Sequence, residues 1–360
     1  MRLNRRLAGN NNAAVGLLLA MLGAAALPCL AEAPQFYRLE SAVSFPGAVG
    51  GWDYVTFEPA RSYLYLGRRE QGVSVYDARA GKLVGSIQNS AGANAAKLVE
   101  EFDRGYTVNE DGSSTVFQLS TLKTLERVKL GEDADNAFYD PATGQLAFMM
   151  GDSKQIAFVE AKSGKLLGKL AMDSSKLESA APDGQGSLFV AERDRNRVVR
   201  IDVAQRKLTA EWPTTGCEQP TGLALDQAGK RIFVGCRGSK PVLAVLDAET
   251  GRVVATPEIG RGNDGVVYDA QEHRIYTSNG VDANLVIYDQ VDPDTYKLEQ
   301  AVGTRPQART MALDPASKKL YLVTAEGVVD PAREINRGAA PFYLNRYFAD
   351  SFTLLTYSRR

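Results

Sequence analysis

Seven polar residues recur along the chain at nearly constant spacing, at steps of 41, 41, 43, 43, 43 and 45 residues. They are four acids, an amide, a hydroxyl and an arginine: Asp53, Asn94, Asp135, Glu178, Thr221, Asp264 and Arg309. Carboxylate and amide oxygens are preferred ligands of hard cations such as Ca²⁺, and crowded carboxylates raise one another's pKa. Brought together, these residues would form either a ligand site or a structural ring bonded to neighbouring backbone and water. We rank the structural role first.

Each of these residues opens a segment that belongs to a repeated unit. The unit 220–262 holds four short β-rich runs, 221–225, 231–235, 242–247 and 253–259, separated by polar turns. The residue ending the third run recurs at steps of 41, 42, 42, 45, 42 and 69, at Asp77, Gln118, Glu160, Asp202, Asp247, Asp289 and Ser358. Four strands in 40–45 residues are typical of a β-propeller blade. The sequence predicts an all-β, seven-bladed propeller whose first strands line a central channel.

The last repeat lacks a fourth strand, because the sequence given stops at Arg360, shortly after its third strand. A spare β-rich segment, residues 36–45, precedes the first complete blade. We expect this N-terminal strand to close the last blade, since closure removes the exposed sheet edges of an open ring. Residues 32–360 are therefore expected to form one domain, because no single blade can bury its own faces.

Two further groups of residues are expected at the mouth of the channel. The ends of the second strands deliver polar side chains there, namely Arg68, Asn109, Arg193, Arg237 and Asn279. A long insertion, residues 326–350, separates the second and third strands of the last blade and should emerge on the same face. Its aromatic and arginine side chains suit a protein interface, and we expect a partner surface of Arg333, Arg337, Phe342, Tyr343, Arg346, Tyr347 and Phe348. The alternative is a loop that packs its own aromatic side chains onto the rim.

The residue types argue against several kinds of catalysis. The chain has one histidine, His273, in a predicted turn at the opposite end of blade six, so no Ser–His–Asp triad and no histidine-based zinc site can form. Cys217 and Cys236 flank the open end of the hairpin 221–235, and we expect them to form a disulfide. No catalytic residue is predicted.

Residues 1–31 have the features of a secretory signal peptide. Arg2, Arg5 and Arg6 precede an apolar run, residues 13–27, which is short for a membrane span, and cleavage is expected after Ala31. Removing the leader leaves 39 basic and 43 acidic residues, a net charge of −4, which does not favour a nucleic-acid surface. We expect a periplasmic protein with no membrane span, most simply a monomer.

The repeats resemble a known group of proteins, the bacterial YVTN-repeat or YncE-like β-propellers. The resemblance rests on GWDYVTFEP (51–59), YDPATGQL (139–146), CEQPTGLALDQAGKRIFVGCR (217–237), YTSNG (276–280) and ARTMALDP (308–315). It covers nearly all of the chain after the leader and implies the propeller fold, while the group as a whole implies no particular chemistry. Asn94, where a histidine is expected, and the insertion 326–350 depart from the pattern.

Three functions are compatible with these features. The first is a non-catalytic binding or scaffold protein, without cofactor, that holds a periplasmic protein or a small ligand at the channel mouth and the 326–350 loop. The second is a hydrolase similar to propeller lactonases, with Ca²⁺ or another divalent cation held by Asp53, Asp135, Glu178 and Asp264. The third, suggested by compartment and by likeness to propeller subunits, is an accessory protein of a quinone-dependent dehydrogenase.

Overall fold

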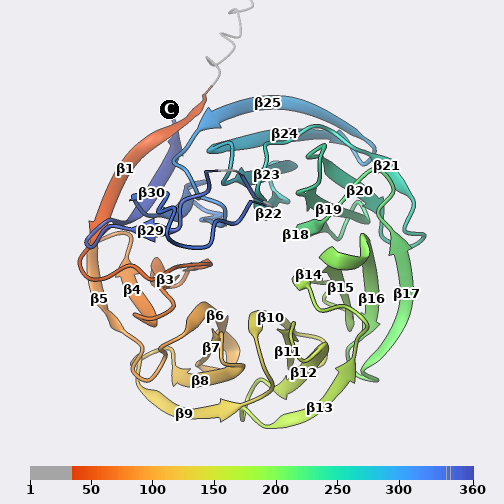
Figure 1. Ribbon diagram of the computed structural model, residues 1–360. Coiled ribbons are helices and arrows are strands. Elements are labelled where there is room, and N and C mark those ends of the chain that lie inside the picture. The colour runs from red at the N-terminus through yellow and green to blue at the C-terminus, as the bar shows by residue number, and fades with distance from the viewer. Residues whose placement is uncertain (1–34, 338, 341) are drawn as a thin grey trace, which may run out of the picture. The chain divides into compact units, whose positions relative to one another are not determined.

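The computed structural model describes residues 35–337, 339–340 and 342–360, so the predicted leader, 1–31, lies outside the described residues. The strands form seven four-stranded antiparallel sheets, arranged as blades of a ring around a central channel (Figure 1). This confirms the predicted fold and the number of blades. No helix among the described residues is long and apolar enough to cross a membrane.

Blades one to four each run from an inner to an outer strand in chain order. Blade one holds β2 (Val55–Glu58), β3 (Tyr63–Gly67), β4 (Val73–Asp77) and β5 (Lys82–Ser86). Blade two holds β6 (Ala93–Val99), β7 (Arg104–Asn109), β8 (Ser113–Gln118) and β9 (Thr124–Lys129). Blade three holds β10 (Ala134–Asp140), β11 (Gln145–Met150), β12 (Gln155–Glu160) and β13 (Leu166–Ala171). Blade four holds β14 (Leu177–Pro182), β15 (Ser187–Glu192), β16 (Arg197–Asp202) and β17 (Lys207–Pro213).

The remaining blades follow the same plan until the last. Blade five holds β18 (Pro220–Asp226), β19 (Arg231–Cys236), β20 (Leu243–Asp247) and β21 (Val253–Ala255). Blade six holds β22 (Asn263–Asp269), β23 (Arg274–Asn279), β24 (Asn284–Asp292) and β25 (Thr295–Gly303). Two short 3₁₀ helices, η1 (Glu100–Phe102) and η2 (Arg193–Arg195), lie between strands of blades two and four. β21 ends earlier than the predicted run 253–259, which contains Pro257, a residue with no backbone N–H for the ladder.

Blade seven is closed by the N-terminal strand, as predicted. Its sheet has the order β1 (Tyr37–Phe45), β30 (Phe352–Arg359), β27 (Leu320–Thr324) and β26 (Met311–Leu313). The first strand pairs with β30 from Tyr37 opposite Arg359 to Phe45 opposite Phe352. β1 is therefore the outermost strand of the last blade, and strands from both ends of the chain share one sheet.

The apolar core lies between and within the blades. Seven clusters of buried side chains pack around the ring; the one between blades seven and one contains Trp52, Leu64, Val323 and Phe352. Trp212 packs against Phe189 of its own blade and borders the cluster shared with blade five. Because neighbouring blades bury one another's faces, their stacking fixes how the inner strands meet around the channel.

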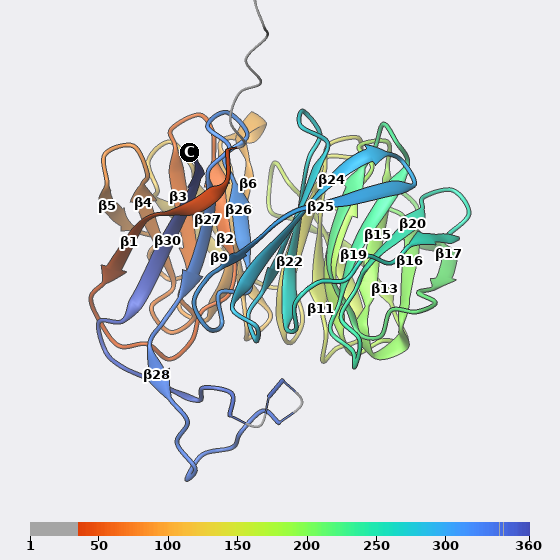
Figure 2. The same cartoon turned by 90° about the horizontal axis from the view of Figure 1, so that it is seen from above.

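The insertion in blade seven stands out from one face of the ring (Figure 2). It contains a two-stranded hairpin, β28 (Gly327–Val328) and β29 (Arg346–Tyr347), with residues 329–345 between the strands. In the view along the channel, the segment extends from blade seven toward β22 at the edge of the central opening (Figure 1). The predicted position of the insertion, on the face where the inner strands begin, is thus the observed one.

Candidate functional site

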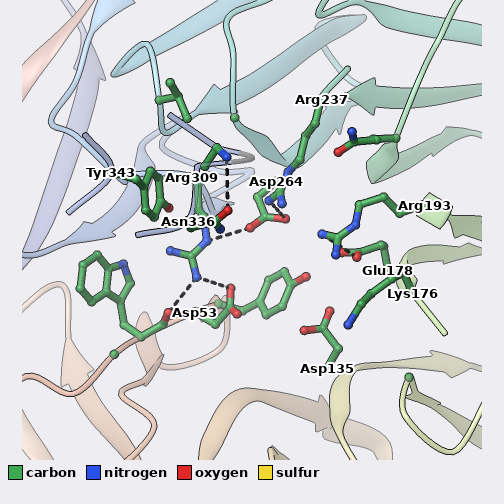
Figure 3. A pocket seen from close by; sticks show the side chains of 18 of the residues that line it. Asp53, Asp135, Lys176, Glu178, Arg193, Arg237, Asp264, Arg309, Asn336 and Tyr343 are labelled. Atoms are coloured by element: carbon green, nitrogen blue, oxygen red, sulfur yellow. Dashed lines mark hydrogen bonds and ion pairs between the residues drawn. The ribbon is translucent and has the colours of Figure 1, made fainter. Parts of the chain in front are cut away.

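A cavity of about 820 Å³ lies at the mouth of the channel, where the inner strands begin. That volume lies within the range typical of small-molecule sites. Five of the seven predicted ring residues line it, namely Asp53, Asp135, Glu178, Asp264 and Arg309. They converge because each inner strand starts at the same level of its blade, so equivalent positions of successive repeats face a common axis (Figure 3).

An ion-pair network joins blades five, six, seven and one across the cavity. The Nε atom of Arg309 lies 2.8 Å from Asp264 Oδ2, and its Nη2 atom lies 3.4 Å from Asp53 Oδ1 and 3.0 Å from the Trp52 carbonyl oxygen. The Nη2 atom of Arg237 lies 2.5 Å from Asp264 Oδ1 (Figure 3). Asp264 is thus held by two arginines. Such charge-assisted pairs fix the relative positions of the blades at this end.

Three further ion pairs lie at or next to the charged wall. Arg193 Nη1 lies 2.9 Å from Glu178 Oε1. Arg69 reaches Asp53 at 3.4 Å and Glu110 at 2.7 Å. Burial raises the pKa of Glu178 against the pull of Arg193, and it raises the pKa of Asp53 against the pull of Arg309. In both carboxyls, burial shifts the pKa more than the neighbouring arginine does. The charged form of each carboxyl is therefore disfavoured in this site.

Asp135 differs from the other ring carboxylates because no described residue donates a hydrogen bond to it or forms an ion pair with it. Burial, followed by the charges of Glu178 and Asp53, raises its pKa well above the ordinary aspartate value. Tyr54, which also lines the cavity, has a raised pKa for the same reasons, burial first and then the charge of Asp135. Asp135 is thus the one ring carboxylate left open to the cavity.

Asn94 and Thr221, the two uncharged residues of the predicted ring, do not line the cavity. The amide of Asn94 donates to the Ala134 carbonyl oxygen of the next blade at 3.0 Å. The hydroxyl of Thr221 donates to the Gln219 carbonyl oxygen at 3.0 Å. Both side chains are buried, so their roles are the structural ones expected of this ring.

The predicted mouth residues divide in the same way. Arg193 and Arg237 line the cavity, whereas Arg68, Asn109 and Asn279 do not. The guanidinium of Arg68 lies 4.8 Å from the centre of the Phe352 ring and donates to the Pro46 carbonyl oxygen. Asn109 and Asn279 are fully buried and bond to neighbouring polar side chains, Ser113 and Asn284. These three residues therefore stabilise blade ends instead of facing the channel.

Arg69, not Arg68, is the cavity residue at the end of β3. The backbone of Arg69 has positive φ, 42°, and its peptide forms an isolated bridge with Ala93 of blade two. Because the chain turns at Arg69 and does not continue as a strand, the Arg69 side chain points the opposite way from the one that a continued strand would give it. The prediction placed the arginine one residue too early because the strand repeat alone does not reveal the turn.

The insertion supplies the roof of the cavity, through Asn336, Ala339, Tyr343 and Tyr347. The Tyr347 ring packs edge-on against Trp52, at 4.7 Å between centroids, and its hydroxyl donates to Gln307 at 2.6 Å. These contacts tie the insertion to blades one and seven. Two residues of the predicted partner surface, Tyr343 and Tyr347, therefore face the cavity.

The other predicted partner residues lie outside the cavity. Arg333 and Arg346 form ion pairs with Asp330 of the same insertion, at 3.8 and 3.4 Å. Arg337 is exposed. Phe342 and Phe348 are 74% and 51% exposed, a high value for phenylalanine. The insertion thus presents two tyrosines to the channel and two phenylalanines to its surroundings.

Several lining residues were not predicted, among them Tyr54, Lys176 and Asn336. Lys176 precedes Glu178 by two residues, and the period of two along a strand would have placed both on one face. Tyr54 follows the ring residue Asp53 directly, and no pattern in the sequence indicates that it also borders the cavity. Asn336 belongs to the insertion, whose path across the mouth follows from packing.

The four carboxylates proposed as cation ligands line the same cavity but do not form a metal-binding cluster. In the described part of the chain, no group of three or more His, Cys, Asp or Glu side chains is arranged to hold a metal ion. Arg309 lies between Asp53 and Asp264, and Arg193 engages Glu178. Three of the four carboxylates are thus paired with arginines.

Cys217 and Cys236 form the predicted disulfide, with Cα atoms 5.5 Å apart. Cys217 lies just before β18 and Cys236 ends β19, so the bridge closes the open end of this hairpin. Both residues are buried, which places the bridge inside the cluster shared by blades four and five. A disulfide is compatible with an oxidising compartment such as the periplasm.

Comparisons with known proteins agree with the architecture. No family model matches the chain. Two curated proteins, the uncharacterized protein YncE of Salmonella typhi and that of Salmonella typhimurium, are each 27% identical over 177 residues, or 47% of this chain and 49% of theirs. The match thus spans about half the length of these relatives.

Solved structures resemble the chain in fold alone. A chain in a crystal structure of the mitotic checkpoint complex superposes with a TM-score of 0.70 at 14% identity, over 97% of this chain and 99% of that one. A chain of Kuenenia stuttgartiensis hydrazine synthase gives 0.65 at 15% identity, over 78% and 94%. At such identities, a shared propeller fold says nothing about activity.

Proposed function

Because the chain is a YncE-like seven-bladed β-propeller, we propose that it is a non-catalytic periplasmic binding protein that holds a small polar ligand in the channel mouth. One observation carries the proposal: the cavity of about 820 Å³ has a charged wall and a roof supplied by the 326–350 loop. A concave site with a few positioned polar groups is the usual form of a ligand site. The loop adds aromatic rings to that site through Tyr343 and Tyr347.

The placement of the chain's reactive groups favours binding over catalysis. His273, the only histidine in the sequence, lies in the turn between β22 and β23, at the opposite end of its blade from the cavity. There its Nδ1 atom is 3.1 Å from the Tyr268 hydroxyl. The cavity arginines and carboxylates mostly pair with one another, an arrangement that shapes a site more than it activates a nucleophile.

The insertion offers a matched pair of variants that tests this function. Tyr343→Ala removes a ring that lines the cavity, whereas Phe342→Ala removes a neighbouring ring that is 74% exposed. A thermal-shift screen of amines, amino acids, dicarboxylates and sugars, followed by calorimetry of the hits, should identify ligands whose affinity falls at least about tenfold in Tyr343→Ala. Phe342→Ala should bind them like the parent protein. Hits that bind both variants equally would contradict a cavity site, and so would a screen without hits.

A second candidate is docking of a periplasmic protein on the outer side of the insertion. The exposed Phe342 and Phe348 favour it, because aromatic side chains often anchor protein interfaces. For this function the expected effects of the substitutions are reversed. A Phe342→Ala/Phe348→Ala protein should no longer bind its partner, while Tyr343→Ala should still bind it. Tyr343→Ala and the double variant thus separate the two functions.

A further inference from the structure

We propose that the ligand of the cavity carries an ammonium group, which binds between Asp135 and Glu178. This inference rests on the proposed small-ligand function and names the chemical class of the ligand. The ammonium class is inferred by comparing the charged groups of the wall that already have partners with those that have none. The ammonium belongs either to a free small amine or to the amino terminus of a peptide, since both present the same donors.

Arg309 and Arg237 are poor sites for an anion, because each already pairs with a carboxylate and donates to a backbone carbonyl oxygen. Arg309 donates to Asp264 and to the Trp52 carbonyl oxygen. Arg237 pairs with Asp264 and also donates to the Asn263 carbonyl oxygen. An anionic ligand would have to break these buried pairs, and breaking such a pair leaves a charge uncompensated.

Asp135 is the opposite case, since its carboxylate is partly accessible and has no partner among the described residues. Figure 3 shows the Asp135, Glu178 and Lys176 side chains ending in the same part of the cavity. Glu178 forms its ion pair with Arg193 through Oε1, at 2.9 Å. Three other polar atoms of the wall lack a hydrogen bond and are buried from solvent, namely Trp52 Nε1, Arg69 Nε and Asp53 Oδ1, the last of which lies 3.4 Å from Arg309 Nη2. A ligand that enters the cavity therefore meets open acceptors, which an ammonium satisfies with its three donors.

One tyrosine ring supports the same class of ligand. Tyr54 lines the cavity just before the inner strand of blade one, and the charge of Asp135 acts on it, so the ring lies near that carboxylate. Aromatic faces attract ammonium groups, and the attraction grows when the site is shielded from water. A carboxylate near an aromatic ring thus favours an organic cation over a bare metal ion, for which the described residues form no ligand cluster.

Lys176 is the competing cation at this position. It is exposed, lines the cavity and forms no ion pair with Asp135.

Binding of an ammonium should depend on pH through Asp135. Burial and the charge of Glu178 raise the pKa of Asp135, and the charges of Asp53, Asp264 and Asp133 add to this effect. An incoming ammonium should therefore displace a proton from Asp135, so binding should be tighter at pH 7.5 than at pH 5.

The test uses four probes that share a four-carbon chain: 1,4-diaminobutane, 4-aminobutyrate, succinate and 1,4-butanediol. Calorimetry on the chain expressed with its own leader should show binding of the two amines and none of the diol or diacid. Asp135→Asn should weaken amine binding at least about tenfold, a loss expected for a charge-assisted contact. Asp292→Asn, which changes an exposed carboxylate at the opposite end of blade six, should leave it unchanged. Trialanine and N-acetyl-trialanine then show whether a peptide amino terminus binds in the same way.

Two further readouts decide between electrostatic and structural explanations. Lys176→Gln should strengthen amine binding, because it removes the competing cation, whereas a merely structural defect would weaken it. Calorimetry in two buffers of different ionisation enthalpy should show proton release on binding. Equal amine affinity in Asp135→Asn and the parent protein overturns the inference. If succinate binds in a way that depends on Tyr343 and the amines do not bind, the ammonium inference is overturned while the proposed function stands. If no probe and no screened compound binds, both the inference and the proposed function are overturned.

Discussion

Lys97 shows what a single partly buried charge costs this fold. It lies on β6, the inner strand of blade two, with its Nζ atom 4.6 Å from the centre of the Phe138 ring. Among the residues described, none accepts a hydrogen bond from its amine, and burial lowers the pKa of Lys97 to about 8. The ring compensates part of the lost hydration through a cation–π contact, but the charged form remains less favourable than in the unfolded chain.

We predict that Lys97→Met stabilises the protein at pH 7, by an amount on the order of 1 kcal/mol. Because the folded-state pKa lies below that of an unfolded lysine, the parent protein gains stability as pH rises from about 8 to about 10, and the variant lacks this gain. Urea unfolding at pH 7 and pH 10 measures the difference, which should shrink at the higher pH. Lys82→Met, on the exposed outer strand β5, is the control and should show no such trend. A variant less stable than the parent at pH 7 would contradict the prediction.

Among the elements, the hairpin β18–β19 is the one with a covalent constraint. Its bridge joins residues only 19 positions apart, and both sulfur-bearing side chains lie in an apolar cluster. A cross-link that closes a loop of this length restricts the unfolded chain more than it changes the folded one. The disulfide should therefore raise the free energy of unfolding measured at equilibrium.

Replacing both cysteines, Cys217→Ala and Cys236→Ala, should lower the free energy of unfolding by about 3 kcal/mol. Guanidinium unfolding of the oxidised parent, the reduced parent and the variant measures this loss. If the bridge is responsible, the reduced parent should resemble the variant; a reduced parent as stable as the oxidised one would assign the loss to side-chain packing.

At the scale of the whole ring, stability depends on a strand from the other end of the chain. β1 pairs with β30 along its length and also reaches blade six, where Gln300 bonds to the backbone N–H and carbonyl of Tyr37 at 2.8 Å each. The Tyr37 hydroxyl lies 3.1 Å from that of Tyr276, and Lys319 pairs with Glu40 at 2.8 Å. Without β1, the long strand β30 would become an exposed edge.

Starting the chain at Gly47 should therefore produce a protein that aggregates and melts at a lower temperature, whereas starting it at Phe36 should have no such effect. Light scattering and calorimetry provide the measurement. A peptide of residues 36–45 added in trans should restore solubility, because it can pair with β30 by strand addition. A truncated protein that stays monomeric with an unchanged melting temperature would show that β1 is dispensable for closure.

Local patterns in the sequence determined the fold. The repeat of four strands in about 42 residues gave the seven blades, because alternation and turn residues act within each hairpin and need no distant partner. The spare strand 36–45 and the incomplete last blade predicted the closure, and Cys217 and Cys236 at one hairpin predicted the bridge. Equivalent positions in the repeats also located the channel mouth, where five of the seven predicted residues line the cavity.

Only the tertiary structure decided which side chains reach that cavity. Asn94 turns to the backbone of the next blade, and the chain reverses at Arg69, so that Arg69 replaces Arg68 in the wall. The insertion becomes a roof because Tyr347 packs on Trp52, a residue distant in sequence. Local periodicity fixes where a residue lies along a strand. The direction of its side chain at the strand end depends on packing with other blades, which a single repeat does not encode.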